Sequence, residues 1–202
     1  PTYDIDILRK KTNVDKIKDN YARCCDAIKS CIDFVRQHCW INSDRALPGY
    51  NILIPFVYIL FHMPKHVFKE RDIIDLRKFF YISGFTRLFT RYAETRIKIY
   101  IRDVLKVKFD AGNYDFSFID SMRFLKRYES FDGINDDIIN DNLHPTLNLL
   151  QRNFDMTILY ESNDPEIDHI FPKSILKEKG VDDLHINFYA NYWYLPKNQN
   201  RN

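Results

Sequence analysis

The chain has 202 residues, of which 45% are hydrophobic and only five are glycine, and its formal net charge is +2. A chain of this length and apolar content can bury a sizeable core, which excludes an intrinsically disordered protein. Its longest apolar run, residues 52–63, contains Pro55 and falls well short of the ~20 residues that a membrane-spanning helix requires. We therefore expect a buried core helix at this run and no membrane partner.

Charge is unevenly distributed along the chain. Residues 77–108 contain nine basic and two acidic side chains, a balance of +7, whereas residues 129–168 contain ten acidic side chains and one arginine, a balance of −9. A polyanion would be attracted to the first segment and repelled by the second. The basic segment predicts either a face that holds nucleic acid or an ordinary charged helix surface, and the sequence leaves both open.

The first predicted element is a long helix. Apolar or semi-apolar side chains recur in steps of three and four over about seven turns, while charged residues occupy the other face. This stripe consists of Val14, Ile17, Tyr21, Cys24, Ile28, Cys31, Val35 and His38.

The four cysteines lie on or beside this helix, at positions 24, 25, 31 and 39, without Cys-x-x-Cys spacing. This pattern favours buried or half-buried small apolar side chains in a reducing cytoplasm over a zinc site or a disulfide framework.

Turn-forming residues at 42–44 and 48–49 end the long helix, and helical patterns then resume. We expect further helices at about residues 52–62, 71–83, 94–106, 116–129 and 137–153, the last kinked or restarted at His144-Pro145. Residues 1–154 are therefore predicted to form a helical bundle or linker domain.

Composition changes at Asp155. Short strands are predicted at residues 156–160, 166–171 and 192–195, with a short helix at 174–179 ended by Gly180 and another helix starting at Lys197. The predicted fold class is mainly α, a helical bundle followed by a small strand–strand–helix module at residues 155–202.

The Asp168-His169 pair at the end of a predicted strand carries the chemistry. Phosphodiester hydrolysis requires a base for water and a cation for the developing charge. His169 suits the base because imidazole exchanges protons near neutral pH, and Asp168 suits the cation. Adjacent strand residues point to opposite faces, so both can address one phosphate only where the strand ends or bends, which Pro172 favours.

Asn200, near the start of the closing helix, could supply a second, neutral oxygen to the cation. One carboxylate and one amide leave most coordination positions to water and phosphate oxygens, which suits Mg²⁺, with Mn²⁺ as a substitute. A dedicated zinc site would require thiolates or more imidazoles than this segment offers.

Two segments resemble the HNH, or His-Me finger, nuclease motif. Residues 166–174 read Glu-Ile-Asp-His-Ile-Phe-Pro-Lys-Ser, and residues 191–200 read Asn-Tyr-Trp-Tyr-Leu-Pro-Lys-Asn-Gln-Asn. The resemblance implies a ββα-metal nuclease module in which His169 is the general base and Asp168 binds the metal. It also implies that Asn191, the other catalytic-motif residue, braces the loop between the strands, and that Asn200 completes the metal coordination.

More narrowly, the chain resembles the C-terminal part of GmrSD-type modification-dependent restriction endonucleases and the SspE-like proteins of phosphorothioation-linked antiphage defence. Leu47-Pro48, Ile54-Pro55 and residues 85–92 look like the helical linker of those proteins. The resemblance implies a cytoplasmic bacterial enzyme that acts on DNA and is compatible with a homo-oligomer. It also implies an N-terminal sensor or NTPase domain that this chain lacks, so we expect a fragment of a longer protein.

Several side chains near the motif could either contact DNA or have a structural role. We expect DNA phosphate contacts from Lys173, Lys177, Lys197 and Arg201, with Lys179 as a further candidate. The aromatic run at residues 192–194 is expected to cover the core rather than to stack on bases. His185 is expected to line the hairpin loop or touch DNA rather than to bind metal.

The expected function is a metal-dependent DNA endonuclease, which nicks or cleaves phosphodiesters in a bacterial restriction or antiphage defence system. Two alternatives stay open. One is a non-catalytic nucleic-acid-binding or oligomerisation module of a defence protein, and the other is an RNA-cleaving HNH toxin with the same site.

Overall fold

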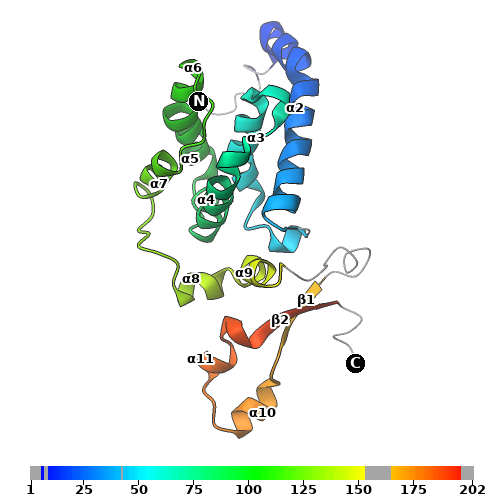
Figure 1. Ribbon diagram of the computed structural model, residues 1–202, viewed down its shortest axis with the longest axis vertical. Helices are drawn as coiled ribbons and strands as arrows, with labels where there is room; N and C mark the ends of the chain where they lie inside the picture. Colours follow the sequence, from blue (N-terminus) through cyan, green and yellow to red (C-terminus); the bar gives the residue numbers. More distant parts are fainter. Residues whose placement is uncertain (1–5, 7–8, 42, 153–164, 197–202) are drawn as a thin grey trace.

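The computed structural model describes residues 6, 9–41, 43–152 and 165–196. Figure 1 shows an upright bundle of N-terminal helices, two short helices crossing beneath it, and a two-stranded hairpin below these, whose connection carries two further short helices at the end furthest from the bundle. The protein is thus mainly helical with one small sheet, as the mainly α prediction requires.

Helix α2, Lys11–His38, is the predicted long helix. Only its second half is packed, with buried side chains at Ala27, Cys31, Phe34 and Val35. No residue between positions 11 and 26 is buried. The helix ends where Trp40 adopts a left-handed conformation with φ 57°. The apolar spacing therefore predicted the helix, although half of its apolar stripe lies in solvent.

The cysteines follow the same division. Cys31 and Cys39 are buried and Cys25 is half-buried, but Cys24 is exposed, which corrects the expectation that all four are shielded. Burial raises the pKa of the Cys31 thiol to about 12. That thiol is therefore unreactive at neutral pH.

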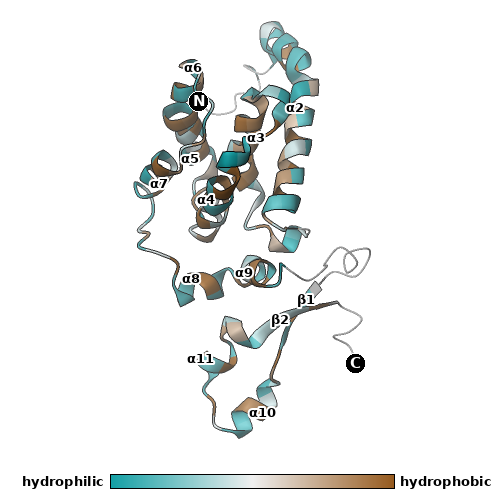
Figure 2. Ribbon diagram, in the orientation of Figure 1, coloured by the Kyte–Doolittle hydropathy of each residue, from teal (hydrophilic) through white to brown (hydrophobic). Residues whose placement is uncertain are grey.

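Helices α3, Leu53–His62, and α4, Ile73–Phe85, form the centre of the bundle at the positions predicted for them. Figure 2 shows α3 among the most apolar ribbons, in contrast to the mixed colours of α2. A Cβ atom at Gly84 would lie 2.5 Å from the Cβ of Pro48. Glycine is therefore required at this point of α4, where the connection between α2 and α3 packs against it. The connections contain 3₁₀ turns at Asp44–Ala46, Tyr50–Ile52, Pro64–His66 and Glu70–Asp72.

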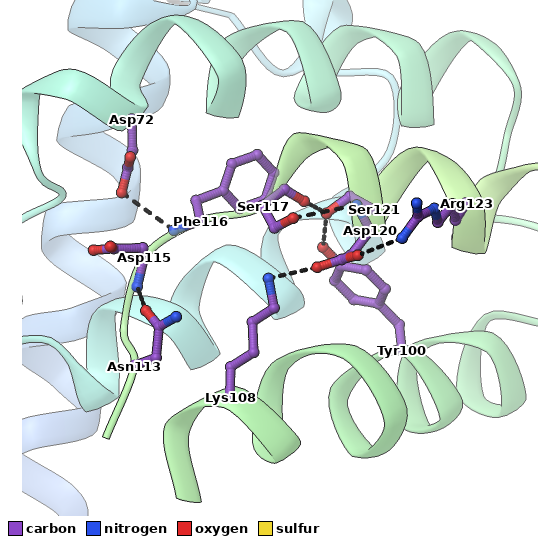
Figure 3. A network of polar contacts seen from close by, with 10 residues as sticks. All are labelled: Asp72, Tyr100, Lys108, Asn113, Asp115, Phe116, Ser117, Asp120, Ser121 and Arg123. Carbon is purple, nitrogen blue, oxygen red and sulfur yellow. Dashed lines mark hydrogen bonds and ion pairs between the residues drawn. The ribbon is translucent and has the colours of Figure 1, made fainter. Parts of the chain in front are cut away.

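A continuous helical stretch follows, made of α5 (Ala93–Tyr100), a π-helical segment (η5, Ile101–Lys106) and α6 (Val107–Asp110). Helix α7, Phe118–Leu125, packs beside it. The hydroxyl of buried Tyr100 and Oγ of Ser121 lie 2.7 Å apart in a hydrogen bond. Figure 3 shows this pair next to the ion pair between Lys108 and Asp120. These contacts fasten α7 to the preceding helix.

The helix predicted at 137–153, with a kink or restart at His144-Pro145, is divided into α8, Asp136–Asp141, and α9, Leu143–Leu150. The break falls at Asn142, directly before the predicted restart at His144-Pro145. Nδ2 of Asn142 donates to the Phe85 carbonyl at 3.2 Å, and Nδ2 of Asn148 donates to the Trp40 carbonyl at 2.9 Å. Side-chain amides therefore attach both short helices to the bundle.

The hairpin consists of β1, Pro165–His169, and β2, Tyr192–Pro196, paired antiparallel with His169 opposite Tyr192. The connection contains α10 (Lys173–Glu178), α11 (Asp183–Ile186) and a 3₁₀ turn at Tyr189–Asn191. The strand predicted at 156–160 and the helix predicted from residue 197 lie outside the described residues. Two of the three predicted strands are therefore present, at nearly the predicted bounds.

Tyr194 joins the hairpin to α9. Its side chain is 6% exposed and packs on Leu147, with Leu143, Ile167 and Tyr192 around them. Its hydroxyl donates to the His144 carbonyl at 2.9 Å and lies 2.7 Å from Nδ1 of the same residue. This burial confirms the prediction of core cover for Tyr194, whereas Trp193 on the other face is 40% exposed.

Within the described residues, every helix is too short or too polar to serve as a transmembrane segment.

Candidate active site

His169 is the last residue of β1, and its ring packs on Tyr192 of β2 with ring centroids 4.4 Å apart. Nε2 of His169 is buried and has no hydrogen-bond partner in the part of the chain that the structure describes. Buried polar atoms without a partner are uncommon because they lose the hydrogen bonds of water. This nitrogen therefore stands out from the rest of the hairpin.

Asp168 precedes His169 and is paired with Trp193, so its side chain leaves the opposite face of the strand. Its Oδ1 accepts a hydrogen bond from the backbone N–H of His169 at 2.8 Å. The carboxylate is thereby held at the end of the strand, where the next two residues, Ile170 and Phe171, are exposed. Within the described ranges this is the one hydrogen bond to the Asp168 carboxylate, which leaves acceptor capacity for a cation.

Asn191 fastens the loop that follows His169. Its Oδ1 accepts from the Phe171 N–H at 2.9 Å, and its Nδ2 donates to the carbonyls of Phe171 at 3.3 Å and Ile186 at 2.9 Å. Its own carbonyl accepts from the Ile170 N–H at 2.8 Å. The residue is 8% exposed. All of these contacts go to backbone, so Asn191 positions the loop and does not itself face a reacting group.

The predicted DNA contacts are only partly described. Lys173 and Lys177 are exposed on α10, as is Lys179 directly after it, and Lys177 forms an ion pair with Asp183 at 3.1 Å. Lys197, Arg201 and the predicted metal ligand Asn200 lie outside the described residues. The structure therefore places Asp168 and His169 at the end of β1 with their side chains on opposite faces, and Asn191 across the following loop. The second half of the predicted metal site lies outside the described residues.

A metal ion would find one charged ligand of the predicted set here, the Asp168 carboxylate. Among the described residues no group of three or more histidine, cysteine, aspartate or glutamate side chains could hold a metal ion. One carboxylate with open neighbouring positions fits a mostly hydrated Mg²⁺ better than a protein-enclosed ion such as structural Zn²⁺.

His185 belongs to a local capping structure. Asp182 caps α11 by accepting from the His185 backbone N–H at 3.0 Å, and its other oxygen lies 2.6 Å from Nδ1 of the same histidine. The backbone N–H and then the imidazole lower the pKa of the Asp182 carboxyl. His185 is exposed in the hairpin connection, in keeping with the expected loop position.

Ion pairs neutralise much of the basic segment 77–108. Arg96 is buried, pairs with Glu129 at 2.6 Å and donates to the Leu88 carbonyl at 3.1 Å. Lysines 106 and 108 pair with Asp110 and Asp120, and Arg102 pairs with Asp103. These pairs favour an ordinary charged helix surface over a continuous basic face.

Two contacts of the hairpin were not predicted from the sequence. Tyr192 lies against the His169 ring, and His144 is bonded to Tyr194. The alternation of residues along paired strands could have placed Tyr192 beside His169 once the register was known, but the contact with His144 joins segments 50 residues apart.

Comparisons with protein-family models, with curated proteins and with solved structures gave no match to this chain. The protein is mainly helical and carries a two-stranded hairpin with an Asp-His pair at the end of its first strand.

Proposed function

We propose that this protein is a metal-dependent DNA endonuclease of the HNH type, with its site in the ββα-metal module that begins with β1 and β2. The observation that carries the proposal is the attachment of the loop after His169 to the side chain of Asn191. A loop held at this point by a buried amide fixes the end of β1, from which the imidazole and the carboxylate leave on opposite faces, and the proposal requires a phosphate seated across this strand end.

In this proposal His169 removes the proton from the attacking water. Nε2 is enclosed beside the Tyr192 ring, so we assign Nδ1 as the nitrogen that contacts the water. Asp168, together with Asn200, would hold a divalent metal ion. When bound, such an ion neutralises charge on the phosphoryl and leaving oxygens. Exposed Lys173 and Lys177 would contact backbone phosphates without reading sequence.

A plasmid nicking assay tests the proposal. Wild-type protein should nick supercoiled DNA with Mg²⁺ and stop with EDTA, and His169→Ala should lower the rate by roughly 10²–10⁴-fold, the usual contribution of a general base. His185→Ala is the matched control, because this histidine belongs to the α11 cap, and it should retain the wild-type rate.

Each alternative has its own outcome in the same assay. Nicking retained by His169→Ala would refute the base assignment. A DNA shift without nicking, equal in Mg²⁺ and EDTA, would indicate a binding module. Faster cleavage of RNA than of DNA in parallel digests would indicate an RNA-cleaving enzyme.

The bacterial restriction or antiphage setting and the partner domain that senses the signal are parts of the same proposal. They are supported by the motif in residues 166–174 and 191–200, and by the helices that precede it.

A further inference from the structure

The first half of α2 extends as an unpacked helix with an apolar stripe. Four large side chains along the stripe are exposed, two in the first half and two in the second, namely Ile17 (53%), Tyr21 (67%), Ile28 (44%) and Ile32 (42%). Their spacing places them on one face over about 22 Å of helix. Helices in proteins owe most of their stability to tertiary packing of such a face, yet no residue from 11 to 26 is buried in this chain.

A cavity lies at the C-terminal end of this stripe. It has a volume of about 330 Å³, and its lining is mostly apolar, with Ile32 and Val35 of α2 and Ile41, Leu47, Tyr50 and Leu53. Arg36, Ser43 and Asp44 complete the lining. The lining residues that follow α2, from Ile41 to Leu53, form the side of the cavity facing the helix, so the stripe ends in a groove. A groove of this kind suits an apolar side chain that anchors a docked helix.

The flank of the stripe away from the bundle is basic. Lys11, Lys18, Lys29 and Arg36 fall within one narrow sector of the helix, next to the apolar side chains. All four are exposed. Asp15, Asp26 and Asp33 follow on the side of this sector further from the stripe. Lys29 pairs with Asp26 at 3.6 Å, and neither Lys18 nor Arg36 has an ion pair among the described residues.

We propose that this face of α2, the apolar stripe with its basic flank, is the docking site for an amphipathic helix of a partner protein that carries acidic residues beside its apolar face. Charge decides between occupants. A second copy would bring one basic flank against another, which is unfavourable, whereas an acidic flank adds attraction and fixes the orientation. The surface of an anionic bilayer would attract the basic flank, but it would not fill the cavity at the end of the stripe.

The test uses two designed 18-residue helical peptides with the same leucine and phenylalanine stripe, one flanked by glutamate and the other by lysine. Fluorescence anisotropy should show the glutamate peptide binding wild-type protein at least tenfold more tightly than the lysine peptide. Ile17→Ser/Ile28→Ser should weaken the glutamate peptide at least tenfold. Ala22→Ser/Gln37→Ser, two exposed and uncharged positions outside the stripe, should leave its affinity within twofold.

Charge reversal supplies the stronger test, because Lys18→Glu/Lys29→Glu/Arg36→Glu should invert the preference between the two peptides. Circular dichroism would confirm that each variant is folded. Equal affinity of both peptides for wild-type protein would overturn the proposal. Sedimentation showing a dimer abolished by Ile17→Ser/Ile28→Ser would assign the face to a second copy, and equally tight binding to phosphatidylserine vesicles would assign it to a membrane.

Discussion

The side-chain amide of Asn191 directs all three of its hydrogen bonds to backbone groups, two on Phe171 and one on Ile186. A neutral amide can do this because it offers donors and an acceptor together, which neither a carboxylate nor an aliphatic side chain can match. The orientation of the chain after His169 therefore depends on one side chain across the loop.

Truncation of this amide should loosen the loop. In Asn191→Ala the Phe171 N–H and the Ile186 carbonyl lose their partners, so we expect a loss of about 1–3 kcal/mol in the free energy of unfolding. Hydrogen exchange at the Phe171 amide should be at least tenfold faster. Asn187→Ala, at an exposed position on the same connection, should leave that amide unchanged. If both variants exchange at the wild-type rate, Asn191 does not hold the loop.

Among the elements, α9 and β2 depend on each other through His144 and Tyr194. Desolvation, followed by the charge of Arg45, lowers the pKa of His144 below its ordinary value of 6.5. The unfolded chain therefore binds this proton more readily than the folded one. The contribution of neutral His144 to the free energy of unfolding is therefore fully present above pH 6.5 and is lost as the pH falls through the folded-state pKa.

His144→Asn should reduce this acid sensitivity, because asparagine can still bond to the Tyr194 hydroxyl and does not titrate. Urea unfolding between pH 5 and 7.5 measures the slope. Burial and Arg23 lower the pKa of His62 as well, so the double variant His62→Asn/His144→Asn should flatten the curve further. An unchanged slope in His144→Asn would place the pH dependence elsewhere.

A comparison of predicted and observed helices shows which parts of the fold could be predicted from the sequence. The apolar run at residues 52–63 located α3, and α4 lies close to its predicted range. The three-and-four spacing located α2 closely because a helix imposes that period on any face it buries. The same spacing could not show that Ile17 and Tyr21 are exposed, since burial depends on a neighbour that the local pattern does not contain. The π-helical segment at 101–106 was equally hidden, because it lies within one uninterrupted helical pattern.

At the site, adjacent sequence placed Asp168 and His169 together, and the resemblance named Asn191. What no local pattern contained was the set of long-range contacts, such as His144 with Tyr194 or Arg96 with Glu129. The basic balance of segment 77–108 likewise ignored the acids that neutralise it, because some of them come from outside the segment.

At the scale of the whole molecule, the distribution of paired and unpaired basic side chains predicts where a polyanion would bind. Lys173 is exposed and has no ion pair among the described residues, whereas Lys106 pairs with Asp110 at 2.5 Å. Lys173→Ala should lower the slope of log affinity against log salt by about one unit, and Lys106→Ala should leave it unchanged. Filter binding to duplex DNA in EDTA measures both. A larger change in slope for Lys106→Ala than for Lys173→Ala would instead indicate that DNA binds to the helical bundle.

The two tryptophans occupy separate parts of the molecule. Trp40 lies beneath two guanidinium groups, with Cζ of Arg77 4.5 Å and Cζ of Arg152 5.3 Å from its ring, while Trp193 of β2 is 40% exposed. Their indole emission therefore reports on different events with no added label. Detachment of the C-terminal segment would remove Arg152 from the first indole and should alter its emission. Solvent or DNA that reaches the hairpin should shift the emission wavelength of the second indole.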